Sequence, residues 1–192
     1  MVLKPQDVYV TLKLASTNSD RAPYSQLAAE LGMSPSEVHA SIQRAQACHL
    51  LHGPALKHRP NLSAIEEFLV HGLKYVFPAV RGGLVRGVPT SYAAEPLRSV
   101  IIQGADPIPV WPSDQGKQRG IAFEPLYRSA PSAALKDSRF YEYLILADAL
   151  RDGRARERNI AATMLRRHFK ESDAQPKPKS THRRSAAFAS TA

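Results

Sequence analysis

The chain has 192 residues, of which 43% are hydrophobic and 22% charged, so it can bury a core and we do not expect a wholly disordered protein. It has no run of about 18 apolar residues to span a membrane, and its one cysteine, Cys48, excludes an internal disulfide. The residues from Met1 to Pro5 show none of the features typical of a secretory leader, so we expect a cytoplasmic protein. The 26 Lys and Arg against 17 Asp and Glu leave a formal net charge of +9. This excess favours a polyanionic partner, nucleic acid first, because neutralised phosphates release condensed counterions.

The first 77 residues predict three helices, a short hairpin and a fourth helix. Apolar residues recur at helical spacing over about 6–15, which predicts the first helix. A compact second helix is predicted over 25–31. Gly32 then stands where a left-handed backbone conformation, which glycine adopts without steric cost, ends a helix.

The third helix, predicted over 35–47, has a complete start signal. Ser34 is the expected N-cap, Pro35 fits the first helical position, and Glu37 closes a capping box with Ser34. One narrow stripe of this helix is apolar, formed by Val38, Ile42 and Ala45. The opposite surface carries only small, polar or basic side chains, namely Ser36, His39, Ala40, Gln43 and Arg44.

The segment Tyr24 to Ala45, YSQLAAELGMSPSEVHASIQRA, resembles the helix-turn-helix of bacterial winged-helix regulators in the broad MarR-like sense. The resemblance continues through Leu50 and Leu51, where such proteins begin the wing, and covers about 60 residues. It implies a winged helix-turn-helix in which helix 35–47 enters the major groove of double-stranded DNA.

Candidate DNA-binding residues lie on this helix and on the following hairpin. They are Ser34, Ser36, His39, Ala40, Gln43, Arg44, Lys57 and Arg59. Arg44 can donate to guanine or phosphate, and Gln43 can pair with an adenine edge. The two serines lie near a helix N-terminus, whose free amides suit a phosphate oxygen. For Glu37, the capping role is favoured over a base contact.

The hairpin, expected within 50–60, contains two prolines and should therefore be short. A fourth helix is predicted from about Asn61, with Ser63 and Glu66 as its capping box, to an end near Phe77 ahead of Pro78.

Residues 78–131 hold eight of the 15 prolines and six of the ten glycines, so we predict a largely irregular segment. Within it, Leu97–Ile102 is a candidate buried strand, and Trp111 is expected to anchor the packing. Helices are predicted again at 138–150 and about 154–169, the second one studded with arginines. That arginine surface is open to three interpretations: contact with DNA, contact with an acidic partner, or simple solvation.

The predicted fold is therefore mainly α-helical. It comprises a winged helix-turn-helix domain at 1–77, the irregular segment at 78–131, a C-terminal helical segment at 132–170 and a disordered basic tail at 171–192.

No grouping of residues indicates catalysis, a cofactor or a metal. The one cluster worth testing for zinc comprises Cys48, His49, His52 and His58. We do not expect these side chains to converge, because His49 should end a helix and His52 should open the hairpin.

The favoured function is that of a sequence-specific, double-stranded DNA-binding transcriptional regulator, a cytoplasmic repressor acting as a homodimer. The alternative is an antitoxin-like module that binds a partner protein through residues 78–170. RNA binding is a third and weaker hypothesis. The lack of an aromatic-rich surface on which bases could stack argues against it.

Overall fold

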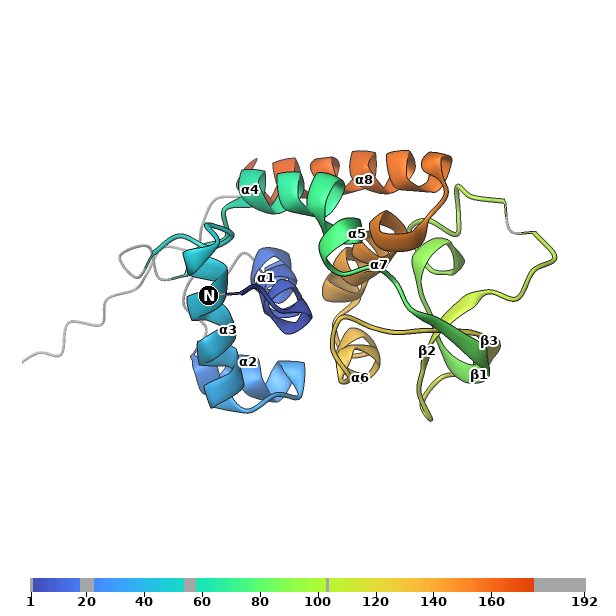
Figure 1. Cartoon of the computed structure of the whole chain (residues 1–192), viewed down its shortest axis with the longest axis horizontal. Coiled ribbons are helices and arrows are strands. Elements are labelled where there is room, and N and C mark those ends of the chain that lie inside the picture. The colour runs from blue at the N-terminus through green and yellow to red at the C-terminus, as the bar shows by residue number, and fades with distance from the viewer. Residues whose placement is uncertain (1, 18–22, 54–57, 103, 175–192) are drawn as a thin grey trace, which may run out of the picture.

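A computed structural model describes residues 2–17, 23–53, 58–102 and 104–174 (Figure 1). The chain is mainly helical, as predicted, and it also contains a small three-stranded sheet that was not predicted. The helices are α1 Pro5–Thr17, α2 Tyr24–Leu31, α3 Pro35–Ala47, α4 Leu62–Glu67, α5 Leu73–Val76, α6 Ala130–Ala134, α7 Ser138–Asp152 and α8 Ala155–Ala174. The strands are β1 Arg81–Pro89, β2 Pro109–Pro112 and β3 Gln118–Phe123. No helix in the described part of the chain is long and apolar enough to cross a membrane.

Helices α1, α2 and α3 form where the sequence places them. Gly32 ends α2 in the left-handed conformation, with φ of 63°, which confirms the predicted turn. The capping box of α3 is also confirmed: the Ser34 hydroxyl accepts from the Glu37 amide at 3.2 Å, and the Glu37 carboxylate accepts from the Ser34 amide at 2.9 Å. The predicted stripe of α3 is buried against α1 and α2.

The fourth helix differs from the prediction at its start and in its middle. Asn61, not Ser63, is the N-cap, and its side chain accepts from the Ala64 amide at 3.3 Å. Asn61 already donates its own amide to the Leu50 carbonyl, which fixes it at the entry to the helix. The helix then passes through a π-helical turn at Phe68–Gly72 before α5, which ends at Val76, close to the predicted end.

The segment predicted to be irregular contains the sheet. Strand β1 pairs antiparallel with both β2 and β3, and these two pair parallel, so the three strands close on themselves. Glycine permits this tight closure: a Cβ on Gly120 would lie 2.1 Å from the Ile108 carbonyl oxygen. The glycines of this segment were read as a sign of irregular structure. They instead allow the strands of the sheet to lie close to one another.

The proposed strand at Leu97–Ile102 is wrong, because this stretch forms turns. Only Leu97 is buried there, whereas Ile102 is 94% exposed. An apolar run without a partner strand has no ladder of hydrogen bonds to hold it extended.

Helix α7 lies at the centre of the core, in contact with α1, α5, α6 and α8 (Figure 1). Trp111 is buried as predicted, and its indole Nε1 donates to Asp148 of α7 at 2.7 Å. Thr90 donates to the same carboxylate at 2.8 Å, and Arg151 pairs with it at 2.8 Å. One core therefore joins the N-terminal helices, the sheet and α7.

Helix α8 extends beyond its predicted end near residue 169. Residues 171–174, assigned to the disordered tail, are helical. Ser172 is buried and accepts a hydrogen bond from Arg139, so the helix continues because this turn packs on α7. The tail from 175 to 192 lies outside the described residues.

Candidate functional site

The outward surface of α3 is the candidate site. Ser36, His39 and Gln43 are exposed, and Ala40 is half-buried. The opposite stripe is buried in the core. The capped helix therefore presents its polar surface to the outside of the molecule, on the left-hand side in Figure 1.

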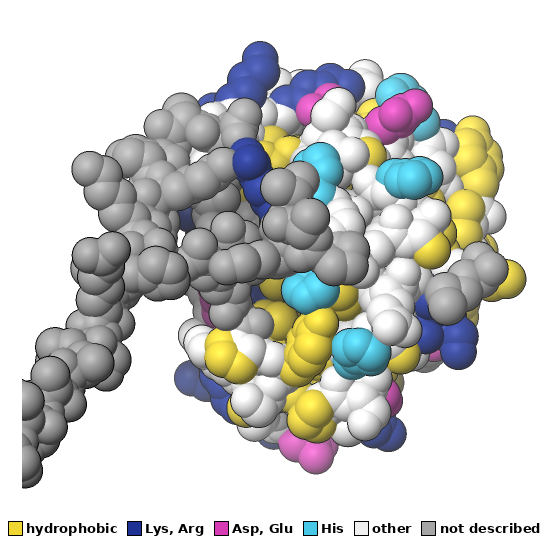
Figure 2. All heavy atoms as spheres, turned by 90° about the vertical axis from the view of Figure 1, so that its left-hand side faces the viewer, with side chains coloured by type: hydrophobic (Ala, Val, Ile, Leu, Met, Phe, Trp, Pro, Cys, Tyr) yellow, Lys and Arg dark blue, Asp and Glu magenta, His cyan; other side chains and the backbone are white. Residues whose placement is uncertain are grey.

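Histidines are a prominent feature of this side of the molecule. Figure 2 shows histidine side chains spread over the face, whereas Lys and Arg lie mostly toward its edges. His39 lies on α3 and His58 on the hairpin, and both rings contact that of Tyr24, with centroid separations of 5.3 and 5.6 Å. The surface around α3 is thus more polar than basic.

Both carboxylate oxygens of Glu37 are engaged at the start of α3. One accepts from the Ser34 amide and hydroxyl, and the other accepts from the Tyr127 hydroxyl at 2.9 Å. These donors, the Ser34 amide first, lower the pKa of Glu37. The predicted capping role is confirmed, whereas the bond to Tyr127, a residue far along the chain, had no signal in the sequence.

Arg44 does not project freely from α3. Its Nε and Nη2 donate to the two oxygens of Asp7 at 2.8 and 2.7 Å. The Asp7 side chain is completely buried and that of Arg44 is 14% exposed. The guanidinium therefore joins α3 to α1 in this structure and is not presented with Gln43 on the outer surface.

The hairpin after α3 is described at its base, on either side of residues 54–57. Leu51 and Pro60 form an isolated antiparallel bridge, and the His52 amide donates to the Arg59 carbonyl at 2.8 Å. Arg59 is half-buried at the base of this hairpin. Lys57, the other predicted cation of this segment, lies outside the described residues.

His58 fixes the hairpin to the helices. Its Nε2 lies 2.8 Å from the Tyr24 hydroxyl and its Nδ1 lies 2.8 Å from the side-chain nitrogen of Gln46. Burial lowers the pKa of His58, with a smaller contribution from His39. No pattern in the sequence predicts this positioning role for His58.

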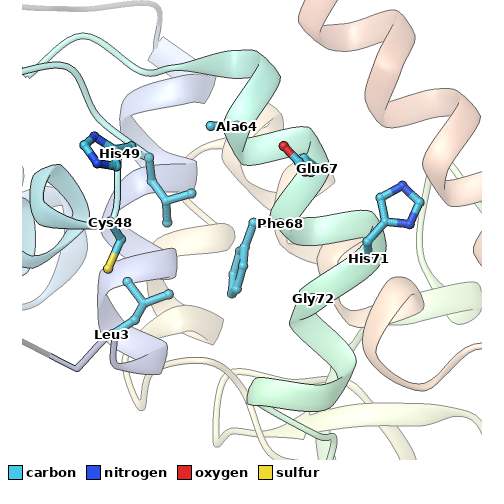
Figure 3. A pocket seen from close by; sticks show the side chains of 9 residues that line it. Leu3, Cys48, His49, Ala64, Glu67, Phe68, His71 and Gly72 are labelled. Carbon is cyan, nitrogen blue, oxygen red and sulfur yellow. The ribbon is translucent and has the colours of Figure 1, made fainter.

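A cavity of about 520 Å³ lies between the residues that follow α3 and the π-helical turn at Phe68–Gly72 (Figure 3). Its lining is largely apolar and includes Leu3, Leu50 and Phe68, with Cys48 and His49 at one side. Cys48 and His49 point in different directions there (Figure 3). Among the described residues, no three His, Cys, Asp or Glu side chains lie close enough together to hold a metal ion.

Comparisons of the chain with protein-family models, with curated proteins and with solved structures found no match.

Proposed function

We propose that this chain is a sequence-specific DNA-binding transcriptional regulator, a repressor, built on a winged helix-turn-helix. The observation that carries the proposal is the exposed polar surface of α3, a helix capped at its start and held from behind by the core. In this proposal, α2, the Gly32 turn and α3 act as the helix-turn-helix, and the hairpin that is bridged at Leu51 and Pro60 acts as a minimal wing; the left-handed Gly32 and the bridge support this assignment.

In this proposal, α3 enters the major groove with Ser36, His39, Ala40 and Gln43 nearest the bases. Gln43 is the principal base-contacting residue, because its amide can pair with both groups on an adenine edge. A single helix contacts few base pairs, so a homodimer that binds two half-sites is expected.

The test is selection of binding sites from random duplex DNA, followed by measurement with Gln43→Ala. The variant should lose about 1–3 kcal/mol of discrimination at one base position while retaining its salt-sensitive background binding. Gln118→Ala is the matched control, because Gln118 is an exposed glutamine on β3, on the other side of the molecule from α3 (Figure 1). An unchanged site preference in Gln43→Ala would refute this role of α3.

A second candidate function is the antitoxin-like interaction of residues 78–170 with a partner protein. A hollow of about 370 Å³ along α8 favours it; the lining residues are Asn159, Ile160, Thr163, Met164 and Arg167. A partner that co-purifies with the wild type, but not with Met164→Asp, would support this function.

A further inference from the structure

The proposed DNA interface needs positive charge that α3 does not supply. Binding to duplex DNA draws much of its free energy from cations that neutralise phosphates. Helix α3 contains one Lys or Arg, Arg44, and Asp7 already neutralises it. Cations that contact phosphates must therefore come from segments beside α3.

One such segment is the loop over 124–129, which comes from far along the chain and packs against the start of α3. The Tyr127 ring stacks on that of Tyr9, with centroids 5.5 Å apart, and the Tyr127 hydroxyl donates to Glu37. The Ser129 hydroxyl donates to the Leu31 carbonyl at the end of α2. These contacts hold the loop against both helices of the proposed helix-turn-helix.

Arg128 lies between these two anchored residues and is exposed. Its guanidinium carbon lies 5.9 Å from the centre of the Tyr127 ring, so the cation stays close to the residue that contacts the start of α3. It also lies within electrostatic range of Glu37, where it contributes to the lowered pKa of that carboxyl.

Arg128 is not held in a close ion pair by the described residues. Among the described residues, no carboxylate lies within 4.0 Å of its guanidinium. Glu37, the acidic group nearby, already accepts three hydrogen bonds from Ser34 and Tyr127. Arg128 is thus unlike Arg44, whose cation is paired within the fold.

We propose that Arg128 contacts a phosphate of the DNA backbone beside the start of α3, so that the DNA-binding surface combines α3 with the distant 124–129 loop. The inference rests on the proposed function. Arg128 is assigned to a phosphate and not to a base because it stands beside Glu37, at the edge of the α3 surface. Contacts at such positions orient a protein on duplex DNA without specifying sequence.

The experiment measures the affinity of the full chain for a selected duplex and for a random duplex over a range of salt concentrations. Arg128→Ala should weaken binding to both duplexes by the same factor and reduce the slope of log affinity against log salt by about 0.9. Arg128→Lys should preserve the slope, because the charge remains. Arg119→Ala is the control, since it removes an exposed arginine from β3, away from α3, and should leave the slope unchanged (Figure 1).

The outcomes separate this inference from the proposed function. A wild-type slope in Arg128→Ala, an equal loss of slope in Arg119→Ala, or a loss confined to the selected duplex would each overturn the role of Arg128. A wild-type protein that binds no duplex at low salt would overturn the proposed function as well. The melting temperature of Arg128→Ala should match that of the wild type. If it does not, the slope of log affinity against log salt for Arg128→Lys decides the question. A reduced slope in Arg128→Lys would overturn the inference.

Discussion

Arg44 was predicted from the sequence to contact DNA, but in the structure it forms an ion pair with Asp7 that stabilises the fold. Asp7 accepts the Lys4 amide at 2.8 Å as well as the two donors of Arg44, so its carboxylate is satisfied although completely buried. A buried carboxylate is tolerated only with such partners. Arg44 therefore orients α3 against α1, and its loss would disturb the surface that carries Gln43.

Replacement of Arg44 should accordingly destabilise the fold. Arg44→Ala leaves the Asp7 carboxylate buried without its cation, which is expected to cost about 3–5 kcal/mol in the free energy of unfolding. Denaturant unfolding measures this cost, with Gln43→Ala as the neighbouring control at less than about 0.5 kcal/mol. The double variant Asp7→Ala with Arg44→Ala should cost less than the sum of the single changes. An Arg44→Ala protein as stable as the wild type would contradict this account.

At the scale of elements, the sheet depends on close approach between strands. A Cβ on Gly87 would lie 2.1 Å from the Trp111 carbonyl oxygen, and one on Gly120 equally close to that of Ile108. Backbone atoms at these distances cannot be displaced without moving a strand. The closed arrangement of β1, β2 and β3 therefore requires glycine at these positions.

Gly120→Ala should separate the strands and lower the free energy of unfolding by about 1–3 kcal/mol. Gly83→Ala is the matched control in the same sheet, because a Cβ on Gly83 would meet no atom within 4 Å. Thermal unfolding of the two variants tests the comparison. If both melt at the same temperature, the glycine requirement is wrong.

At the scale of the whole molecule, two half-buried histidines join separate segments. His58 links the hairpin to α2 and α3, and His168 of α8 lies 3.8 Å from Glu142 of α7. Burial lowers the pKa of both, and for His168 it outweighs the opposing effect of Glu142. Both are therefore neutral in the folded protein over a pH range in which they are protonated in the unfolded chain.

Stability should consequently fall on acidification. The unfolded chain takes up protons near the ordinary histidine pKa of about 6.5, whereas the folded protein does so only at lower pH. These histidines thus have little effect on stability above about pH 6.5 and destabilise the fold as the pH falls below that value. Denaturant unfolding at several pH values from neutral to mildly acidic measures this, and a double variant, His58→Gln with His168→Gln, should show a shallower decline. Wild-type stability that rises with acidification would contradict the assignment.

The sequence alone determined the helices and the boundaries that depend on near neighbours. The capping box of Ser34 and Glu37, the Gly32 turn and the apolar stripe of α3 are all interactions within a few residues, so local spacing predicts them. The same local signals placed α7 and most of α8.

Tertiary structure alone decided which charged side chains are paired within the fold and which remain on the surface without such a partner. Arg44 is paired by Asp7, 37 residues away, and Glu37 is bonded by Tyr127, 90 residues away. The glycines of 81–123 allow a closed sheet because particular strands lie opposite them. These outcomes depend on contacts between distant segments, and the periodicity of a single segment carries no record of its partners.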